Sequence, residues 1–135
     1  AMWQRRQSTK FNGVAYPVQR AAEALYTPEG HRQSGELIAG YMANAALIHH
    51  EMSRLGFDTI GGRNAPYIWV DGRQDSWEFF DRLLQQAGAV CTPGAGFGRC
   101  GQGYIRISAF NSRENVQRAL ERIGAALGAE KPSHS

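Results

Sequence analysis

The chain has 135 residues, of which 42% are hydrophobic and 20% are charged, a composition typical of one compact domain with a single core. Apolar runs such as Tyr67–Val70 are far shorter than the roughly 20 residues that cross a bilayer, so we expect no membrane segment and no export signal. The net charge of +3 comes from arginines scattered along the chain, which favours a solvated surface over a nucleic-acid interface.

The first part of the sequence predicts two helices. Residues 13–25 suit a helix with Pro17 in its first turn, and Thr27–Glu29 begin a second helix with an N-cap, a proline at N1 and an early acid. Apolar side chains at alternating steps of three and four predict one buried stripe on the second helix: Ile38, Tyr41, Ala45, Ile48, Met52 and Leu55. Gly56 ends it.

Two strands and a helix come next. Residues 57–60 and 67–70 are short apolar or β-branched runs around a connection rich in glycine, asparagine and proline. Asp75 as N-cap and Glu78 three residues later predict a helix that ends at Gly88. Its predicted apolar face consists of Trp77, Phe80, Leu84 and Ala87.

Two further strands and a last helix complete the pattern. Residues 89–92 and 104–108 predict the strands, and Asn111 with Glu114 caps the helix. The apolar face of that helix consists of Val116, Leu120, Ile123 and Leu127.

The element order ααββαββα predicts the fold class α/β, an α+β sandwich with a small mixed sheet and helices packed on it. We expect the strands at Tyr67 and Ala89 to be joined by a right-handed parallel crossover. One domain is expected over residues 1–128, and residues 129–135 form a polar tail that should fray.

Arg106 is the most notable polar residue of the predicted strands. Strand alternation places it on the face opposite Ile105 and Ile107, so a guanidinium lies in an otherwise apolar strand. It either grips a carboxylate with its forked donors, or lies half-exposed on an open sheet face. The residues alone leave both interpretations open.

The segment Thr92–Tyr104 contains five glycines between two strands, more than a hairpin needs. A phosphate-binding loop would run from a strand into a helix N-terminus, whereas this segment runs into a strand. We therefore interpret it as a flexible loop or as one packed against a partner.

The remaining polar candidates favour ordinary roles. Asn12 precedes a helix and suits an N-cap, and His49 and His50 lack the spacing of metal ligands, so no metal site is expected. Cys91 and Cys100 are too few for a disulfide framework and predict free thiols in a reducing compartment, which implies a cytoplasmic location.

Four segments in this order resemble the C-terminal third of LL-diaminopimelate aminotransferases, a subgroup of the class I/II, fold-type-I aminotransferases. They are Thr9–Val14, Asn64–Val70, Thr92–Gly98 and Gly103–Phe110. The resemblance implies that the chain is the small C-terminal domain of such an enzyme, with residues 1–12 as the lead-in from a large domain.

The resemblance also implies a function. In the family, pyridoxal 5'-phosphate carries an amino group from glutamate to ring-opened tetrahydrodipicolinate, which makes LL-diaminopimelate for lysine biosynthesis. The motif arginine, here Arg106, would bind the substrate α-carboxylate. The motif asparagine, here Asn12, would reach cofactor and substrate from the neighbouring subunit of a homodimer.

The sequence departs from the family pattern at the chemical centre. The family's Schiff-base lysine, the aspartate that pairs with the pyridine nitrogen and the phosphate cup have no counterpart here, and neither Lys10 nor Lys131 suits the role of that lysine. We therefore expect a fragment that neither binds the cofactor nor transaminates alone. The alternative is a noncatalytic binding or interaction module derived from the same domain.

Overall fold

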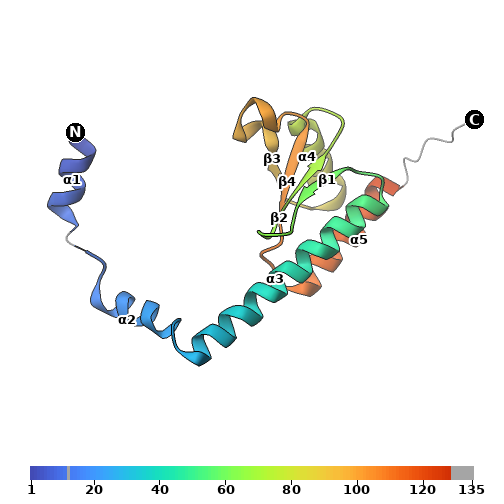
Figure 1. The fold of residues 1–135 in the computed structure, drawn as a ribbon. Coiled ribbons are helices and arrows are strands. Elements are labelled where there is room, and N and C mark those ends of the chain that lie inside the picture. Colours follow the sequence, from blue (N-terminus) through green and yellow to red (C-terminus); the bar gives the residue numbers. More distant parts are fainter. Residues whose placement is uncertain (12, 129–135) are drawn as a thin grey trace, which may run out of the picture. The chain divides into compact units, whose positions relative to one another are not determined.

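A computed structural model describes residues 1–11 and 13–128, which fall into two units with their boundary between Ile38 and Ala39 (Figure 1). The first unit contains α1 (Met2–Lys10), α2 (Tyr16–Ala24) and the start of α3 (Pro28–Arg54). The second contains the rest of α3, a four-stranded sheet, α4 (Ser76–Ala87) and α5 (Arg113–Gly128). Among the described residues, no helix is long and apolar enough to cross a membrane.

The helices of the first unit begin largely where the sequence predicts. Pro17 lies in the first turn of α2, and the backbone N–H of Gly30 donates to Thr27 Oγ1 at 3.0 Å, so Thr27 is the N-cap of α3. Helix α1 was not predicted, because neither an N-cap nor an apolar stripe marks it. No residue of α1 or α2 is buried.

The sheet has the order β1-β2-β4-β3, with β1 (Thr59–Gly61), β2 (Tyr67–Asp71), β3 (Thr92–Pro93) and β4 (Tyr104–Ser108). The predicted α/β fold class is confirmed, but the predicted mixed sheet is wrong, since every described strand pair is antiparallel. Strands β2 and β3, which α4 connects, run in the same direction, as the predicted crossover requires, but β4 lies between them, so the two strands do not pair.

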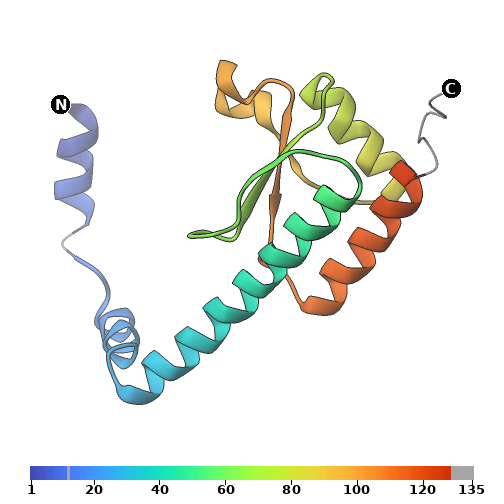
Figure 2. The same cartoon turned by 45° about the vertical axis from the view of Figure 1, so that its right-hand side comes forward.

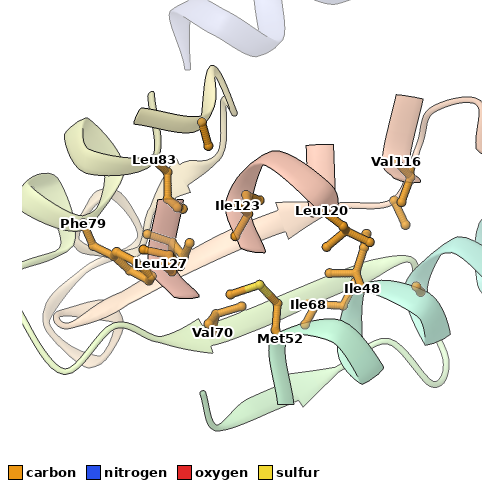
Figure 3. Close-up of a cluster of buried hydrophobic side chains, with 14 residues drawn as sticks. Ile48, Met52, Ile68, Val70, Phe79, Leu83, Val116, Leu120, Ile123 and Leu127 are labelled. Atoms are coloured by element: carbon orange, nitrogen blue, oxygen red, sulfur yellow. The ribbon is translucent and has the colours of Figure 1, made fainter. Parts of the chain in front are cut away.

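Helices cover one face of this sheet (Figure 2). Ile68 and Val70 of β2 and Ile105 of β4 are fully buried against apolar side chains of α3, α4 and α5. Figure 3 shows this core, whose largest fully buried members are Phe79, Met52, Ile68, Leu83, Ile105 and Val70. Burial of this apolar surface is the main favourable contribution to the folding of the second unit.

The predicted buried faces are right for two helices and displaced for the third. All four predicted residues of α5 are buried, and the stripe of α3 is buried at Ala45, Ile48 and Met52, although Ile38 is 59% exposed. Helix α4 buries Ala87 as predicted, but its other buried apolar residues are Phe79 and Leu83, and Trp77 is 56% exposed. Two neighbouring rows of α4 are apolar, so the pattern could not choose between them.

Ser76 decides the face that α4 presents to the core. The residue is fully buried, and its hydroxyl donates to the Gly101 carbonyl at 3.3 Å and accepts from the Gly103 N–H at 3.0 Å. Because a buried hydroxyl must be hydrogen-bonded, these contacts determine how α4 is rotated about its axis.

The glycine-rich segment forms two 3-10 turns, Gly94–Phe97 and Arg99–Gly101. A Cβ on Gly94 would lie 2.1 Å from the Gly101 carbonyl oxygen, and one on Gly101 would lie 2.0 Å from the Gly94 carbonyl oxygen. The two backbones therefore touch, which only glycine permits. The segment is packed on itself and on α4 rather than being a flexible loop.

Asp75 caps α4 as predicted, and its charge contributes to stability. Asp75 Oδ1 accepts from the N–H groups of Trp77 at 2.8 Å and Glu78 at 3.3 Å, and Oδ2 accepts from Gln102 at 2.6 Å. The bonds from Trp77, Glu78 and Gln102 hold the pKa of Asp75 below its ordinary value of 3.8. For α5 the cap is Ser112, not the predicted Asn111, because Ser112 Oγ accepts from the Asn115 N–H.

Replacement of Asp75 should alter the pH dependence of stability. Because folding lowers the pKa of Asp75, its contribution is fully present above 3.8 and is lost as the pH falls from 3.8 through the folded-state value. Urea unfolding at about pH 6 and about pH 3 should show a smaller acid-induced loss for Asp75→Asn, which keeps a capping oxygen, than for the wild type. Asp75→Ala should be less stable at both pH values, and equal acid sensitivity of all three proteins would contradict this account.

Gly94→Ala should destabilise the second unit by about 1–3 kcal/mol, because its Cβ meets backbone oxygens that cannot move aside independently. Gly96→Ala is the matched control, since a Cβ there meets nothing within 4 Å. Unfolding in urea measures both changes. If the two variants had the same stability, the backbone contact between Gly94 and Gly101 would not matter to the fold.

Candidate functional site

The face of the sheet opposite the core carries aromatic and charged side chains. Alternation along β2 and β4 directs Tyr67, Trp69, Tyr104 and Arg106 to this face, and all four are half-buried. Trp69 lies directly opposite Arg106 in the β2–β4 register, and Trp69 and Tyr104 make an edge contact at 6.4 Å between ring centroids. The structure thus supports the predicted placement of Arg106 away from Ile105.

Two aromatic rings contact the guanidinium of Arg106. Its Cζ lies 4.5 Å from the centroid of the Tyr67 ring, which comes from β2, and 4.4 Å from that of Phe97, which comes from the first 3-10 turn. Each ring presents its face to the cation, an arrangement that attracts the charge electrostatically. The guanidinium therefore has a fixed environment even though it bears a solvent-accessible charge.

Arg106 has no hydrogen-bond or ion-pair partner among the described residues. Its Nε is buried and unpaired. Most other arginines of the described part with ordered contacts bind carboxylates, as Arg32 does with Glu29 and Glu36. An unpaired guanidinium donor away from water is costly, and a carboxylate that accepts from it in plane would remove this cost.

A hollow open to solvent adjoins Arg106. It is lined by Gly61 at the end of β1, by residues 62–65 of the β1–β2 connection, and by Tyr67, Trp69 and Arg106. A second hollow, between α3 and α5, contains Glu51 and Arg54, which pair with each other at 2.7 Å. Only the first of these two hollows offers a cation without a partner in the described part of the chain, so it is the candidate ligand site.

The other predicted candidates do not form a site. His50 contacts Glu51 and His49 contacts the Thr59 hydroxyl, and the described residues hold no cluster of metal-ligating side chains. Both cysteines are free, as predicted, and burial raises the pKa of Cys91 to about 11, which favours the protonated thiol. Asn12 lies outside the described residues.

The sequence missed Phe97 as a member of the site. Phe97 belongs to the glycine-rich segment, which we expected to be flexible or packed against a partner, and its contact with Arg106 arises only when that segment folds back over β4. A large apolar residue among five glycines was the signal that could have indicated it.

Comparison with known proteins supports the resemblance seen in the motifs. Residues 2–123 match the family "Aminotransferase class I and II". The LL-diaminopimelate aminotransferase of Desulfotalea psychrophila is 62% identical over 128 residues, covering 94% of this chain and 31% of that protein. The same enzyme of Prochlorococcus marinus (strain MIT 9211) is 56% identical over 125 residues, covering 91% of this chain and 31% of that protein.

Solved structures agree. The L,L-diaminopimelate aminotransferase of Chlamydomonas reinhardtii superimposes with a TM-score of 0.87 at 39% identity, covering 93% of this chain and 31% of that one. An aromatic aminotransferase from Pyrococcus horikoshii OT3 gives 0.75 at 29% identity, covering 82% and 30%. The chain thus spans about a third of the length of these relatives. It belongs to the class I and II aminotransferases.

Proposed function

We propose that residues 1–128 form the small C-terminal domain of an aminotransferase similar to LL-diaminopimelate aminotransferase, and that Arg106 binds the α-carboxylate of its substrates. The observation that carries this proposal is the guanidinium itself, which contacts two rings and has no hydrogen-bond or ion-pair partner in the described part of the chain. A planar carboxylate fits the forked donors of arginine better than the point charge of lysine.

One arginine can serve both halves of an amino transfer. Amino acids and keto acids differ at the reacting carbon but share the adjacent carboxylate, so a fixed guanidinium holds that carbon in the same place before and after the amino group moves. Such positioning uses the free energy of substrate binding to orient the reacting carbon, which raises the rate of the chemical step. The rigid sheet is suited to this task, because β4 is paired with strands on both sides.

The proposed substrates follow from the named relatives. Identity of 62% over 128 residues supports amino transfer between glutamate and tetrahydrodipicolinate, in lysine biosynthesis, as the reaction of the complete enzyme. We place that enzyme in the cytoplasm, since both cysteines are free thiols.

Family members use pyridoxal phosphate, which acts as the electron sink of the reaction. The described residues do not fit this cofactor: their one lysine, Lys10, is exposed at the C-terminal end of α1. An activated lysine needs desolvation or a cationic neighbour in a pocket. We therefore propose that the chain alone neither binds the cofactor covalently nor transaminates. We also propose, from the family resemblance, that Asn12 reaches cofactor and substrate only in a dimer.

Exposed apolar side chains of the first unit support such an assembly. Trp3 of α1, Tyr16 and Val18 of α2, and Tyr26 are more than half exposed. Apolar surface of this kind commonly marks an interface. We propose that these helices pack on a large domain and a second subunit in the complete enzyme.

Arg106→Ala should weaken binding of L-glutamate by at least about tenfold, because hydrogen bonds between charged groups contribute about 1.5–3 kcal/mol. Titration of the chain followed by NMR should give millimolar affinity for the wild type, since one arginine supplies few of the contacts of a complete site. Arg118→Ala, which removes an exposed arginine of α5, is the control and should bind like the wild type. Equal affinity of the Arg106→Ala and wild-type chains would refute the carboxylate site.

Addition of pyridoxal phosphate to the chain should give neither a lysine-linked absorbance band nor amino transfer from glutamate to a keto acid. The Lys10→Ala variant should have the same spectrum as the wild type, because Lys10 is exposed. An absorbance band that disappears in Lys10→Ala would show that the chain carries its own cofactor lysine.

A further inference from the structure

The glycine-rich segment places Phe97 against the guanidinium of Arg106. We infer that Phe97 and Tyr67 are positioning residues that hold the guanidinium of Arg106 in one plane, and that the glycine-rich segment is the scaffold for Phe97. This inference rests on the proposed role of Arg106 in carboxylate binding.

The position of Phe97 is determined from two directions. Its ring lies 4.4 Å from Arg106 Cζ and makes an edge contact with Trp69 at 5.1 Å between centroids. Trp69 is also the cross-strand neighbour of Arg106, so the three side chains form one cluster on the open sheet face. Phe97 is 50% exposed, which means that contact with this cluster, rather than core burial, accounts for its location.

The backbone that carries Phe97 is anchored to the core. Gly94 and Gly101, at the two ends of the 3-10 turns, pack against each other too closely for any side chain. The Gly101 carbonyl accepts from the hydroxyl of Ser76, which is fully buried at the start of α4. The two turns therefore form a short arch. Gly94 and Gly101 at its ends are fixed against each other, Gly101 is bonded to Ser76 in the core, and Phe97 lies between the two glycines.

Tyr67 is held independently of this arch. It belongs to β2, pairs with Ser108 in the register of β4, and contacts the ring of Phe110 at 5.5 Å between centroids. The two rings on the guanidinium thus come from separate elements, each with its own support. This cluster of Tyr67, Phe97 and Arg106 we call the aromatic clamp.

The clamp has a physical consequence for ligand binding. An arginine side chain loses rotamer freedom when it is immobilised, a cost that ligand binding otherwise bears. Rings on the guanidinium impose much of this ordering during folding. Both rings contact the guanidinium carbon and supply no hydrogen-bond acceptor, so the donors of Arg106 remain without a protein partner among the described residues. A carboxylate is the ligand that accepts such donors in plane.

Phe97→Leu is the direct test, with two measurements on the complete chain. In the free protein, NMR relaxation of the Arg106 Nε–Hε group should show greater mobility than in the wild type. Titration with L-glutamate should show roughly three- to tenfold weaker binding, the size expected for loss of a cation–π contact and its ordering effect.

Two control variants separate the clamp from a general structural effect. Phe97→Tyr keeps the ring and should restore both the Arg106 relaxation and the affinity. Phe80→Leu removes a phenylalanine that likewise contacts a tryptophan edge-on, Trp77 on α4, but that has no contact with Arg106. It should leave Arg106 as rigid as in the wild type.

The outcomes distinguish the clamp from the proposed function. If Phe97→Leu leaves the Arg106 relaxation unchanged, or if Phe80→Leu alters it equally, the clamp is refuted whether or not glutamate binds. If Arg106 becomes mobile while neither the wild type nor Arg106→Ala binds glutamate, the clamp stands as a structural feature and the carboxylate site is refuted.

Discussion

Antiparallel pairing of β2 with β4 is the constraint on which the rest of the structure depends. Its register places Ile68 opposite Ile107 and Val70 opposite Ile105, so both strands present apolar side chains to the same helices. The same register places Trp69 opposite Arg106 on the other face. Because side chains alternate along a strand, a slip of one residue would move Arg106 into the core and Ile105 into solvent. The register of β2 and β4 therefore determines both which side chains enter the core and which side chains form the candidate site.

The site is connected to the core by more than the sheet. Ser76 begins α4, is fully buried and bonds both the Gly101 carbonyl and the Gly103 N–H. Rotation of α4 in the core and placement of the glycine-rich arch are thus linked through one hydroxyl. This explains why α4 buries a serine where a neighbouring row of larger apolar side chains was available: the hydroxyl satisfies two backbone groups that a hydrocarbon would leave unpaired.

Membership of the class I and II aminotransferases gives this arrangement a context. The chain spans about a third of the length of its relatives, and the described part offers an arginine without a hydrogen-bond partner but no buried lysine. On the proposed function, substrate binding and cofactor chemistry come from different parts of the complete enzyme. On the proposed role of Arg106, a rigid guanidinium is useful, because the carboxylate that it would hold must lie at a constant distance from chemistry performed elsewhere.

The sequence by itself determined the elements that rest on local rules. The caps at Thr27 and Asp75, the buried stripe of α5 and the outward placement of Arg106 follow from hydrogen-bonding side chains near their own backbone and from helix and strand periods. The family resemblance came from ordered motifs in the same way. Only the tertiary structure decided that β4 lies between β2 and β3, that α4 turns Phe79 inward, and that Phe97 covers the guanidinium. Each of these depends on contacts between residues distant in sequence, whose energies no local pattern contains.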